Sequence, residues 1–128
     1  MKKIFTVLFV ASILLVSCSK ESKLNRKLDG EWNCVTYDGI APTAGQSLVV
    51  KFDKDKKGKG NMTWTFVDAG VTDVDTYSYV LVEDKKIIFT GTGSTAAYTD
   101  TLLVKSHSKK DLTITDVDGN EPIVLKKK

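Results

Sequence analysis

Apolar and polar residues alternate with a period of two along most of the chain from Gly30 onward. Strict alternation of this kind is typical of half-buried antiparallel strands. Four runs show it most clearly, and the sets expected on their inner faces are Trp32, Cys34 and Thr36; Leu48, Val50 and Phe52; Met62, Trp64 and Phe66; and Tyr77, Tyr79 and Leu81. Four further strands are expected at residues 86–90, 97–105, 111–116 and 121–126.

Turn-forming residues separate these runs. Residues 53–60 are rich in Lys, Asp and Gly, residues 68–75 form an acidic turn, and Asp118-Gly119 is a dipeptide favoured in tight hairpins. About eight strands with short connections predict an all-β fold, an eight-stranded antiparallel up-and-down barrel. The same strands can also divide into a sandwich, and the pattern leaves that alternative open.

The first 17 residues read as a secretory leader. Lys2 and Lys3 precede an apolar stretch at residues 4–16, which fits a signal h-region of roughly 7–15 residues and is short of the ~20 that span a bilayer. Residues 15–18, Leu-Val-Ser-Cys, resemble the lipobox of bacterial lipoproteins. That resemblance implies cleavage before Cys18, acylation of Cys18 with chains such as palmitate, and attachment to the outer membrane, facing the periplasm or the cell surface.

A polar segment follows the lipobox. We expect residues 18–28 to be a lipid-anchored tether that ends in one helical turn, with Leu24 and Leu28 seated against the domain. The predicted organisation is therefore a signal peptide at 1–17, the tether and helical turn at 18–28, and one barrel domain at 29–128.

Residues 28–32, Leu-Asp-Gly-Glu-Trp, are similar to the opening motif of lipocalin-like proteins, in which a Gly-x-Trp begins the first strand. The resemblance covers roughly residues 24–126 and implies an eight-stranded barrel. It also implies that Trp32 plugs the closed end and that Gly30 permits a close backbone approach. The only arginine, Arg26, precedes the motif, so the late arginine that packs on the tryptophan in typical lipocalins is missing.

Charge argues against nucleic acid as a partner. The formal net charge is +3, but Lys2 and Lys3 belong to the leader and three more lysines end the chain at 126–128. No basic stripe with interleaved aromatic residues is present.

Catalytic and metal sites are poorly supported by the residue types. Cys34 is expected to be a buried free thiol, and His107 to lie in an exposed polar turn without a nucleophile motif. One histidine and one spare cysteine do not make a protein zinc site. Residues 116–121 are rich in oxygen ligands but too short for a twelve-residue calcium loop, and a hairpin turn explains them. We expect no catalytic residues, no metal and no cofactor.

The aromatic residues are the remaining signal for function. Inward aromatic side chains can simply fill a small barrel, or they can line a ligand pocket at its mouth. The residues expected to line such a pocket are Trp64, Tyr77, Tyr79 and Tyr98. The sequence therefore predicts a non-enzymatic binding module for a small apolar or amphipathic ligand. The alternative is a protein-interaction module, an inhibitor or an envelope assembly subunit, with a filled core.

Replacing Cys18 by serine tests the lipid anchor. We expect the Cys18→Ser chain to lose acylation and to leave the membrane fraction, because more than one attached acyl chain is needed for stable anchoring. Mass spectrometry and cell fractionation measure both effects. Continued acylation and membrane retention of the variant would contradict the interpretation.

Overall fold

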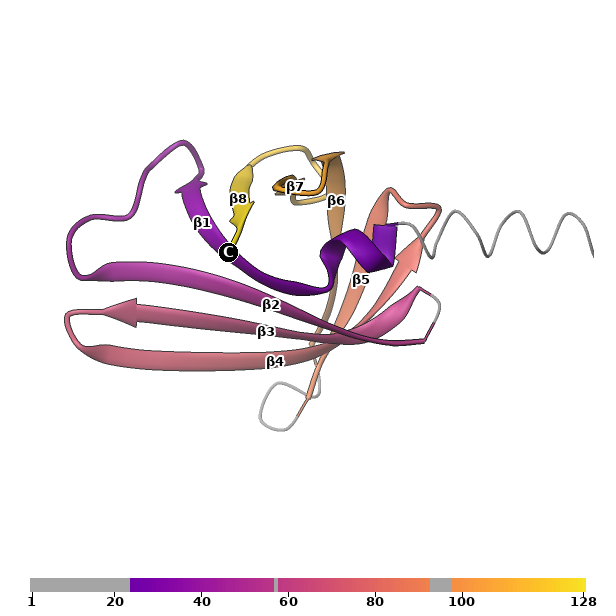
Figure 1. Ribbon diagram of the computed structural model, residues 1–128, viewed down its shortest axis with the longest axis horizontal. Helices are drawn as coiled ribbons and strands as arrows, with labels where there is room; N and C mark the ends of the chain where they lie inside the picture. The colour runs from indigo at the N-terminus through magenta and orange to yellow at the C-terminus, as the bar shows by residue number, and fades with distance from the viewer. Residues whose placement is uncertain (1–23, 57, 93–97) are drawn as a thin grey trace, which may run out of the picture.

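A computed structural model describes residues 24–56, 58–92 and 98–128 of the chain, as an eight-stranded antiparallel barrel (Figure 1). The strands are β1 (Gly30–Tyr37), β2 (Gln46–Lys56), β3 (Lys59–Asp68), β4 (Val71–Val82), β5 (Lys86–Gly91), β6 (Thr99–His107), β7 (Asp111–Thr115) and β8 (Ile123–Lys127). Each pairs with its neighbours in chain order, and β1 pairs with β8 to close the barrel. The predicted up-and-down barrel is confirmed, and the sandwich is excluded.

The leader, Cys18 and the tether up to residue 23 lie outside the described residues. In the described part, no helix is long and apolar enough to cross a membrane. Strand β6 begins at Thr99 and runs to His107, two residues beyond the predicted end at Lys105. The polar end of this strand pairs with β7, where His107 lies opposite Leu112. A hydrophobic pattern cannot predict pairing of polar residues through their backbone.

The core lies inside the barrel and follows the period-two pattern. Inward residues of all four early runs are buried or half-buried, with the exception of Phe66, which is 37% exposed at the end of β3. The fully enclosed apolar set is Leu24, Leu28, Val50, Phe52, Met62, Ile87, Leu112, Ile114 and Leu125, each 0% exposed. Because a one-residue slip would turn each apolar face outward, this burial fixes the register of the strands.

A helix of residues 24–28 plugs one end of the barrel, here called the closed end (Figure 1). Leu24 and Leu28 are completely buried, as predicted for the helical turn. Between them lies Asn25, a polar residue only 2% exposed. The Tyr79 hydroxyl donates to Asn25 Oδ1 at 2.6 Å, and Asn25 Nδ2 donates to the carbonyl of Lys59 at 3.4 Å. These bonds offset the cost of burying the Asn25 amide.

Trp32 packs over the same end, 1% exposed, and its indole Nε1 donates to the Leu28 carbonyl at 2.8 Å. The Lys127 ammonium from β8 lies 4.8 Å from the centroid of the Trp32 ring. Lys127 Nζ also donates to the carbonyls of Lys27, at 2.8 Å, and Asp29. Lys127, in the last strand, therefore places a cation over the Trp32 ring, although the only arginine of the chain, Arg26, precedes the tryptophan.

Two glycines make this packing fit. Gly30 has a φ of +118°, and a Cβ there would lie 3.0 Å from Lys127 Cε, which agrees with the close approach expected of Gly30. At Gly60 a Cβ would lie 2.3 Å from the Asp53 carbonyl and 2.8 Å from the Tyr79 hydroxyl. Nothing in the sequence pattern singled out Gly60.

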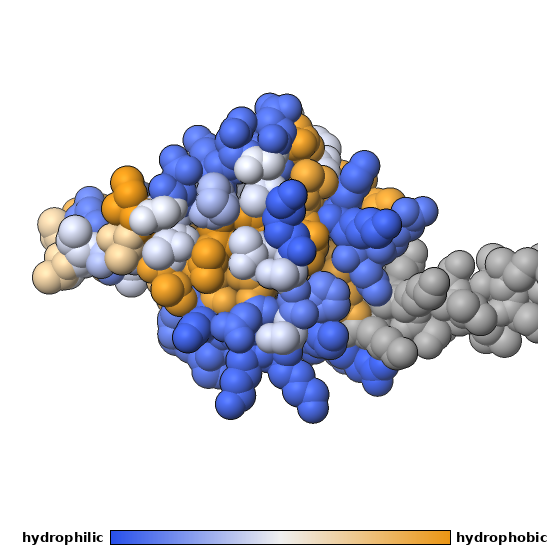
Figure 2. Space-filling view, turned by 90° about the horizontal axis from the view of Figure 1, so that it is seen from above, coloured by the Kyte–Doolittle hydropathy of each residue, from blue (hydrophilic) through white to orange (hydrophobic). Residues whose placement is uncertain are grey.

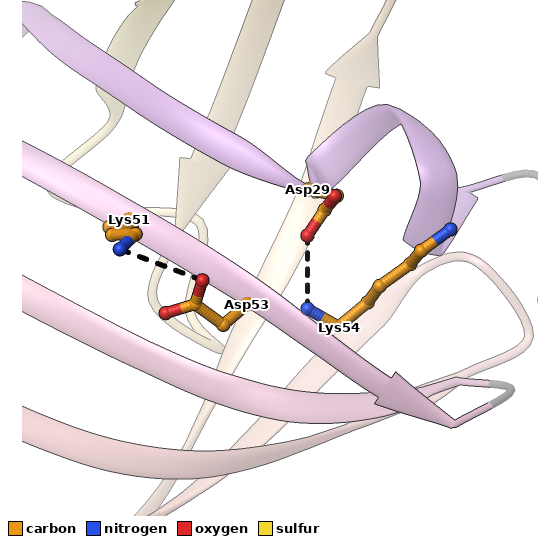
Figure 3. Close-up of polar contacts among 4 residues, drawn as sticks. All are labelled: Asp29, Lys51, Asp53 and Lys54. Carbon is orange, nitrogen blue, oxygen red and sulfur yellow. Dashed lines mark hydrogen bonds and ion pairs between the residues drawn. The ribbon is translucent and has the colours of Figure 1, made fainter.

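Polar contacts tie the exit of the helix to β2 (Figure 3). The Asp29 carboxylate accepts a hydrogen bond from the backbone N–H of Lys54 at 3.1 Å. Nearby on β2, Lys51 and Asp53 form an exposed ion pair at 3.7 Å, which contributes little to stability. The described part of the helix is therefore held by its buried leucines and by a few directed bonds.

Strands β2, β3 and β4 are the longest, with 11, 10 and 12 residues. Their ends away from the helix project past the shorter strands (Figure 1). Among the described residues, no helix covers this side, which is here called the open end.

Tyr79→Phe tests the hydrogen bond between Tyr79 and Asn25 at the closed end. We expect the free energy of unfolding to fall by about 1–2 kcal/mol, because the buried Asn25 Oδ1 loses its tyrosine donor while the ring is kept. Urea denaturation of a chain that begins at Ser19 measures the change; this chain contains the helix and both partners of every strand. The control is Tyr98→Phe, which removes an exposed hydroxyl and should change stability by less than about 0.5 kcal/mol. Equal free energies of unfolding for the two variants would contradict a stabilising role of the Tyr79–Asn25 hydrogen bond.

Candidate functional site

An apolar cavity of about 430 Å³ opens at the open end of the barrel. The loop between β1 and β2 forms one wall through Ile40, Ala41 and Pro42. The inward-facing side chains of Cys34, on β1, and Leu48, on β2, line the cavity from the core side. The exposed lining is mostly apolar, so the cavity suits an apolar body; its polar members are Tyr37, Gln46, Ser47 and Asp68.

A second cavity of about 240 Å³ lies beside it and differs in chemistry. Its wall is partly aromatic and partly acidic, and we call it the acidic cavity. The aromatic residues are Tyr37, Trp64, Phe66, Tyr77, Phe89 and Tyr98. The acidic residues are Asp75, Asp100, Asp116 and Glu121.

Tyr37 and Phe66 line both cavities, so the two are adjacent compartments of one open-end site. Phe66 is 37% exposed and Tyr37 41% exposed, because neither is covered by other side chains at the mouth. The site therefore offers an apolar compartment and an acidic one across a shared aromatic boundary.

Ring contacts hold the aromatic wall in place. Tyr77 and Phe89 meet edge to face with centroids 5.0 Å apart, and Phe89 lies 6.0 Å from Tyr98. Trp64 and Phe66 stack at 6.2 Å. Contacts of this geometry are favourable for ring quadrupoles and give the wall a defined shape.

Trp64 carries a buried donor that has no partner. The side chain is only 9% exposed, and its indole Nε1 makes no hydrogen bond within the described part of the chain. An unsatisfied buried N–H costs about 1–3 kcal/mol, so its persistence in a binding cavity calls for an acceptor from outside the chain. Asp75 stands directly opposite Trp64 in the pairing of β3 with β4.

Burial and the nearby acidic groups raise the pKa values of three tyrosines of the site. Burial, then the charges of Glu121 and Asp38, raise the pKa of Tyr37. Burial and the charge of Asp75 raise the pKa of Tyr77. For Tyr98 the main cause of a raised pKa is its hydroxyl hydrogen bond to Asp100, 2.9 Å long. The tyrosines thus stay protonated, and their hydroxyls remain available as donors and acceptors.

Cys34 is free but only partly buried, so the expected buried thiol is corrected to one that lines the apolar cavity. Its side chain still packs against the core. Burial raises its pKa, which lowers the thiolate fraction and its reactivity. The sequence placed Cys34 on the right face of β1 but could not show that the barrel interior is unfilled above it.

Three of the four predicted ligand residues come together at the open end: Trp64, Tyr77 and Tyr98 line the acidic cavity. Tyr79 does not line either cavity. It lies at the closed end, 1% exposed, with its hydroxyl committed to Asn25. The reason is the place of Tyr79 along β4: two residues of a strand move a side chain by roughly 6.6 Å, from the cavity toward the plugged end.

Sequence reasoning missed the acidic residues of the site. Asp75 is in phase with Tyr77 and Tyr79 on β4, and this alternation was the signal that could have placed it inside. Asp75 was instead assigned to a turn, because a carboxylate is rarely expected to face a barrel interior. Asp100 lies on β6, and Asp116 and Glu121 lie in the connection between β7 and β8; only the closed barrel brings these two segments to Asp75.

The residues considered for catalysis or metal binding, His107 and the turn at residues 116–121, form no metal site in the described part of the chain. His107 is exposed at the end of β6, with its Nδ1 3.4 Å from Lys27 Nζ. In the oxygen-rich turn, Asp116 Oδ1 accepts a hydrogen bond from the Asn120 N–H at 2.7 Å, as in a hairpin connection. Within residues 24–56, 58–92 and 98–128, no three His, Cys, Asp or Glu side chains are grouped so as to hold a metal ion.

The geometry defines a class: a closed eight-stranded β-barrel with one plugged end and one open end that carries a two-compartment site. Comparisons of the chain with protein-family models, with curated proteins and with solved structures found no match.

Alkylation of Cys34 tests the apolar cavity. In the chain that begins at Ser19, Cys34 is the single thiol. We expect iodoacetamide to label it completely in the native state, but several-fold more slowly than in urea, because the cavity admits the reagent while burial lowers the thiolate fraction. Mass spectrometry over time measures both rates. No native labelling would indicate a sealed interior, and equal rates would indicate an exposed strand.

Proposed function

We propose that this protein is a membrane-anchored envelope lipoprotein that binds a small apolar or amphipathic ligand at the open end of its barrel, without catalysis. The apolar cavity carries this proposal. Its volume of about 430 Å³ falls in the range of small-molecule sites, roughly 300–1,000 Å³, and it is open to solvent. The acidic cavity adds convergent polar groups beside the apolar compartment, a combination common in ligand sites.

The position of the tether supports the same function. The helix of residues 24–28, which closes the barrel, directly follows the segment that starts at the predicted lipid anchor, Cys18. The stretch from Cys18 to Leu24 spans at most about 20 Å even when fully extended. The closed end is therefore held near the bilayer, and the open end can face the aqueous phase and take ligand from it.

A protein-interaction module is the second candidate, and exposed apolar side chains at the rim favour it. Ile40 in the β1–β2 loop, Val71 at the start of β4 and Val117 in the β7–β8 turn are 72%, 65% and 56% exposed. Seen from above, apolar side chains also reach the surface near the middle of the molecule, between hydrophilic margins (Figure 2). Scattered exposed apolar residues are common, however, whereas an open apolar cavity is not, so ligand binding is the better supported function.

Binding of 1-decanol tests the proposed function with a neutral ligand. We expect decanol to change the fluorescence of Trp64 and to protect Cys34 from alkylation at the same concentrations in the chain that begins at Ser19. Trp64 and Cys34 line different compartments that share Tyr37 and Phe66, so a ligand seated across them affects both.

Ala41→Phe places a ring in the apolar cavity from an exposed loop and should weaken decanol binding at least tenfold. Val71→Phe is the matched control, since Val71 is exposed and lines neither cavity. The proposal fails if decanol gives neither signal, or if both variants bind it equally well. In that case the rim residues Ile40, Val71 and Val117 become the candidates for a protein contact.

A further inference from the structure

The open end contains negative charges and no positive ones. Its described part consists of four connections with their flanking strand ends, at residues 36–47, 64–76, 89–92 with 98–101, and 114–123. The sequence has no Lys, Arg or His in these segments. Their acidic residues are Asp38, Asp68, Asp73, Asp75, Asp100, Asp116, Asp118 and Glu121.

The described lysines of the barrel lie on its sides or toward the closed end, outside these four segments. The ion pair of Lys128 with Glu31 of β1, 3.4 Å long, and that of Lys51 with Asp53 on β2 lie away from the mouth. In the described residues, neither Asp75 nor Glu121 takes part in an ion pair. A negative potential at the open end is therefore not cancelled locally, and low-dielectric walls strengthen it inside the cavity.

The carboxylates of the acidic cavity are spread around an aromatic wall rather than gathered at one point. No group of them can hold a metal ion among the described residues. A diffuse ring of charge beside tyrosine, phenylalanine and tryptophan faces suits a larger, weakly hydrated cation, which ring quadrupoles attract as well. The apolar cavity that shares Tyr37 and Phe66 would hold an apolar body attached to that cation.

Trp64 provides an independent indication of a ligand. Its indole N–H is buried, belongs to the acidic cavity and has no acceptor in the described structure. An oxygen atom close to the cationic centre of a ligand would satisfy it, for example a hydroxyl, ether or carbonyl oxygen. The carboxylates would attract the cationic centre, and the Trp64 N–H would donate to the neighbouring oxygen, so both can bind the same head group.

We propose that the open-end site selects amphipathic organic cations, with the cationic head in the acidic cavity and the apolar chain in the apolar cavity. This rests on the proposed function and names its ligand class. The head is a protonated amine or a quaternary ammonium group, and the site discriminates against an anionic head on the same chain.

Three probes with one chain length test the selection: decyltrimethylammonium, 1-decanol and decyl sulfate, each below its micelle concentration. In the chain that begins at Ser19, we expect the cation to bind at least about tenfold more tightly than decanol, and decyl sulfate to bind more weakly than decanol. Trp64 fluorescence and Cys34 protection report the affinities. The preference for the cation should shrink as salt is raised, whereas decanol binding should not.

The triple variant Asp75→Asn, Asp116→Asn and Glu121→Gln removes charge from the acidic cavity. It should lose the cation preference and keep decanol binding within about twofold. The matched control, Asp55→Asn, Glu83→Gln and Asp111→Asn, makes the same change in net charge toward the closed end and should keep the preference.

The outcomes separate the two proposals. If decanol binds but the cation binds no more tightly, or if both triple variants lose the preference equally, cation selection is overturned while ligand binding stands. If none of the three probes binds, the proposed function itself fails, and the ligand class with it.

Discussion

Closure of the barrel by the pairing of β1 with β8 is the constraint on which the rest of the structure depends. It brings Lys127 over Trp32, and it places Cys34 opposite Leu125 inside one continuous core. Because each strand of the closed barrel pairs with a neighbour on both sides, the interior has two ends through which a ligand can enter. The helix of residues 24–28 fills one of these ends, so the other becomes the site.

The two ends are built from the same alternating strands but differ in what they enclose. At the closed end, Tyr79 and Asn25 satisfy one another, and Gly60 lets the backbone of β3 approach the tyrosine. At the open end the long strands β2–β4 extend past the others, and their inward residues have too few partners to fill the space between them. Cavities and an unsatisfied Trp64 N–H are the consequence. The well-packed core and the cavities are thus segregated along the barrel axis.

Charge follows the same division. Lysines gather toward the helix and the predicted anchor, and carboxylates gather at the mouth, so the barrel carries a lengthwise charge asymmetry that its small net charge conceals. A whole-chain value of +3 therefore says little about what the open end attracts, because local fields act on a ligand over about a Debye length. Burial, followed by the nearby carboxylates, raises the pKa values of Tyr37 and Tyr77, and the hydrogen bond to Asp100 raises that of Tyr98.

The sequence by itself determined the strands, their inward faces and the helical turn, because hydrophobic periodicity and turn chemistry are local and survive without knowledge of partners. It also brought Trp64, Tyr77 and Tyr98 into consideration as a set. Only the tertiary structure decided that the strands close rather than split, that Tyr79 belongs to the plug, and that Asp75, Asp100, Asp116 and Glu121 meet in one cavity. These facts depend on strand tilt and on pairings between segments far apart in the chain, and no local pattern encodes them.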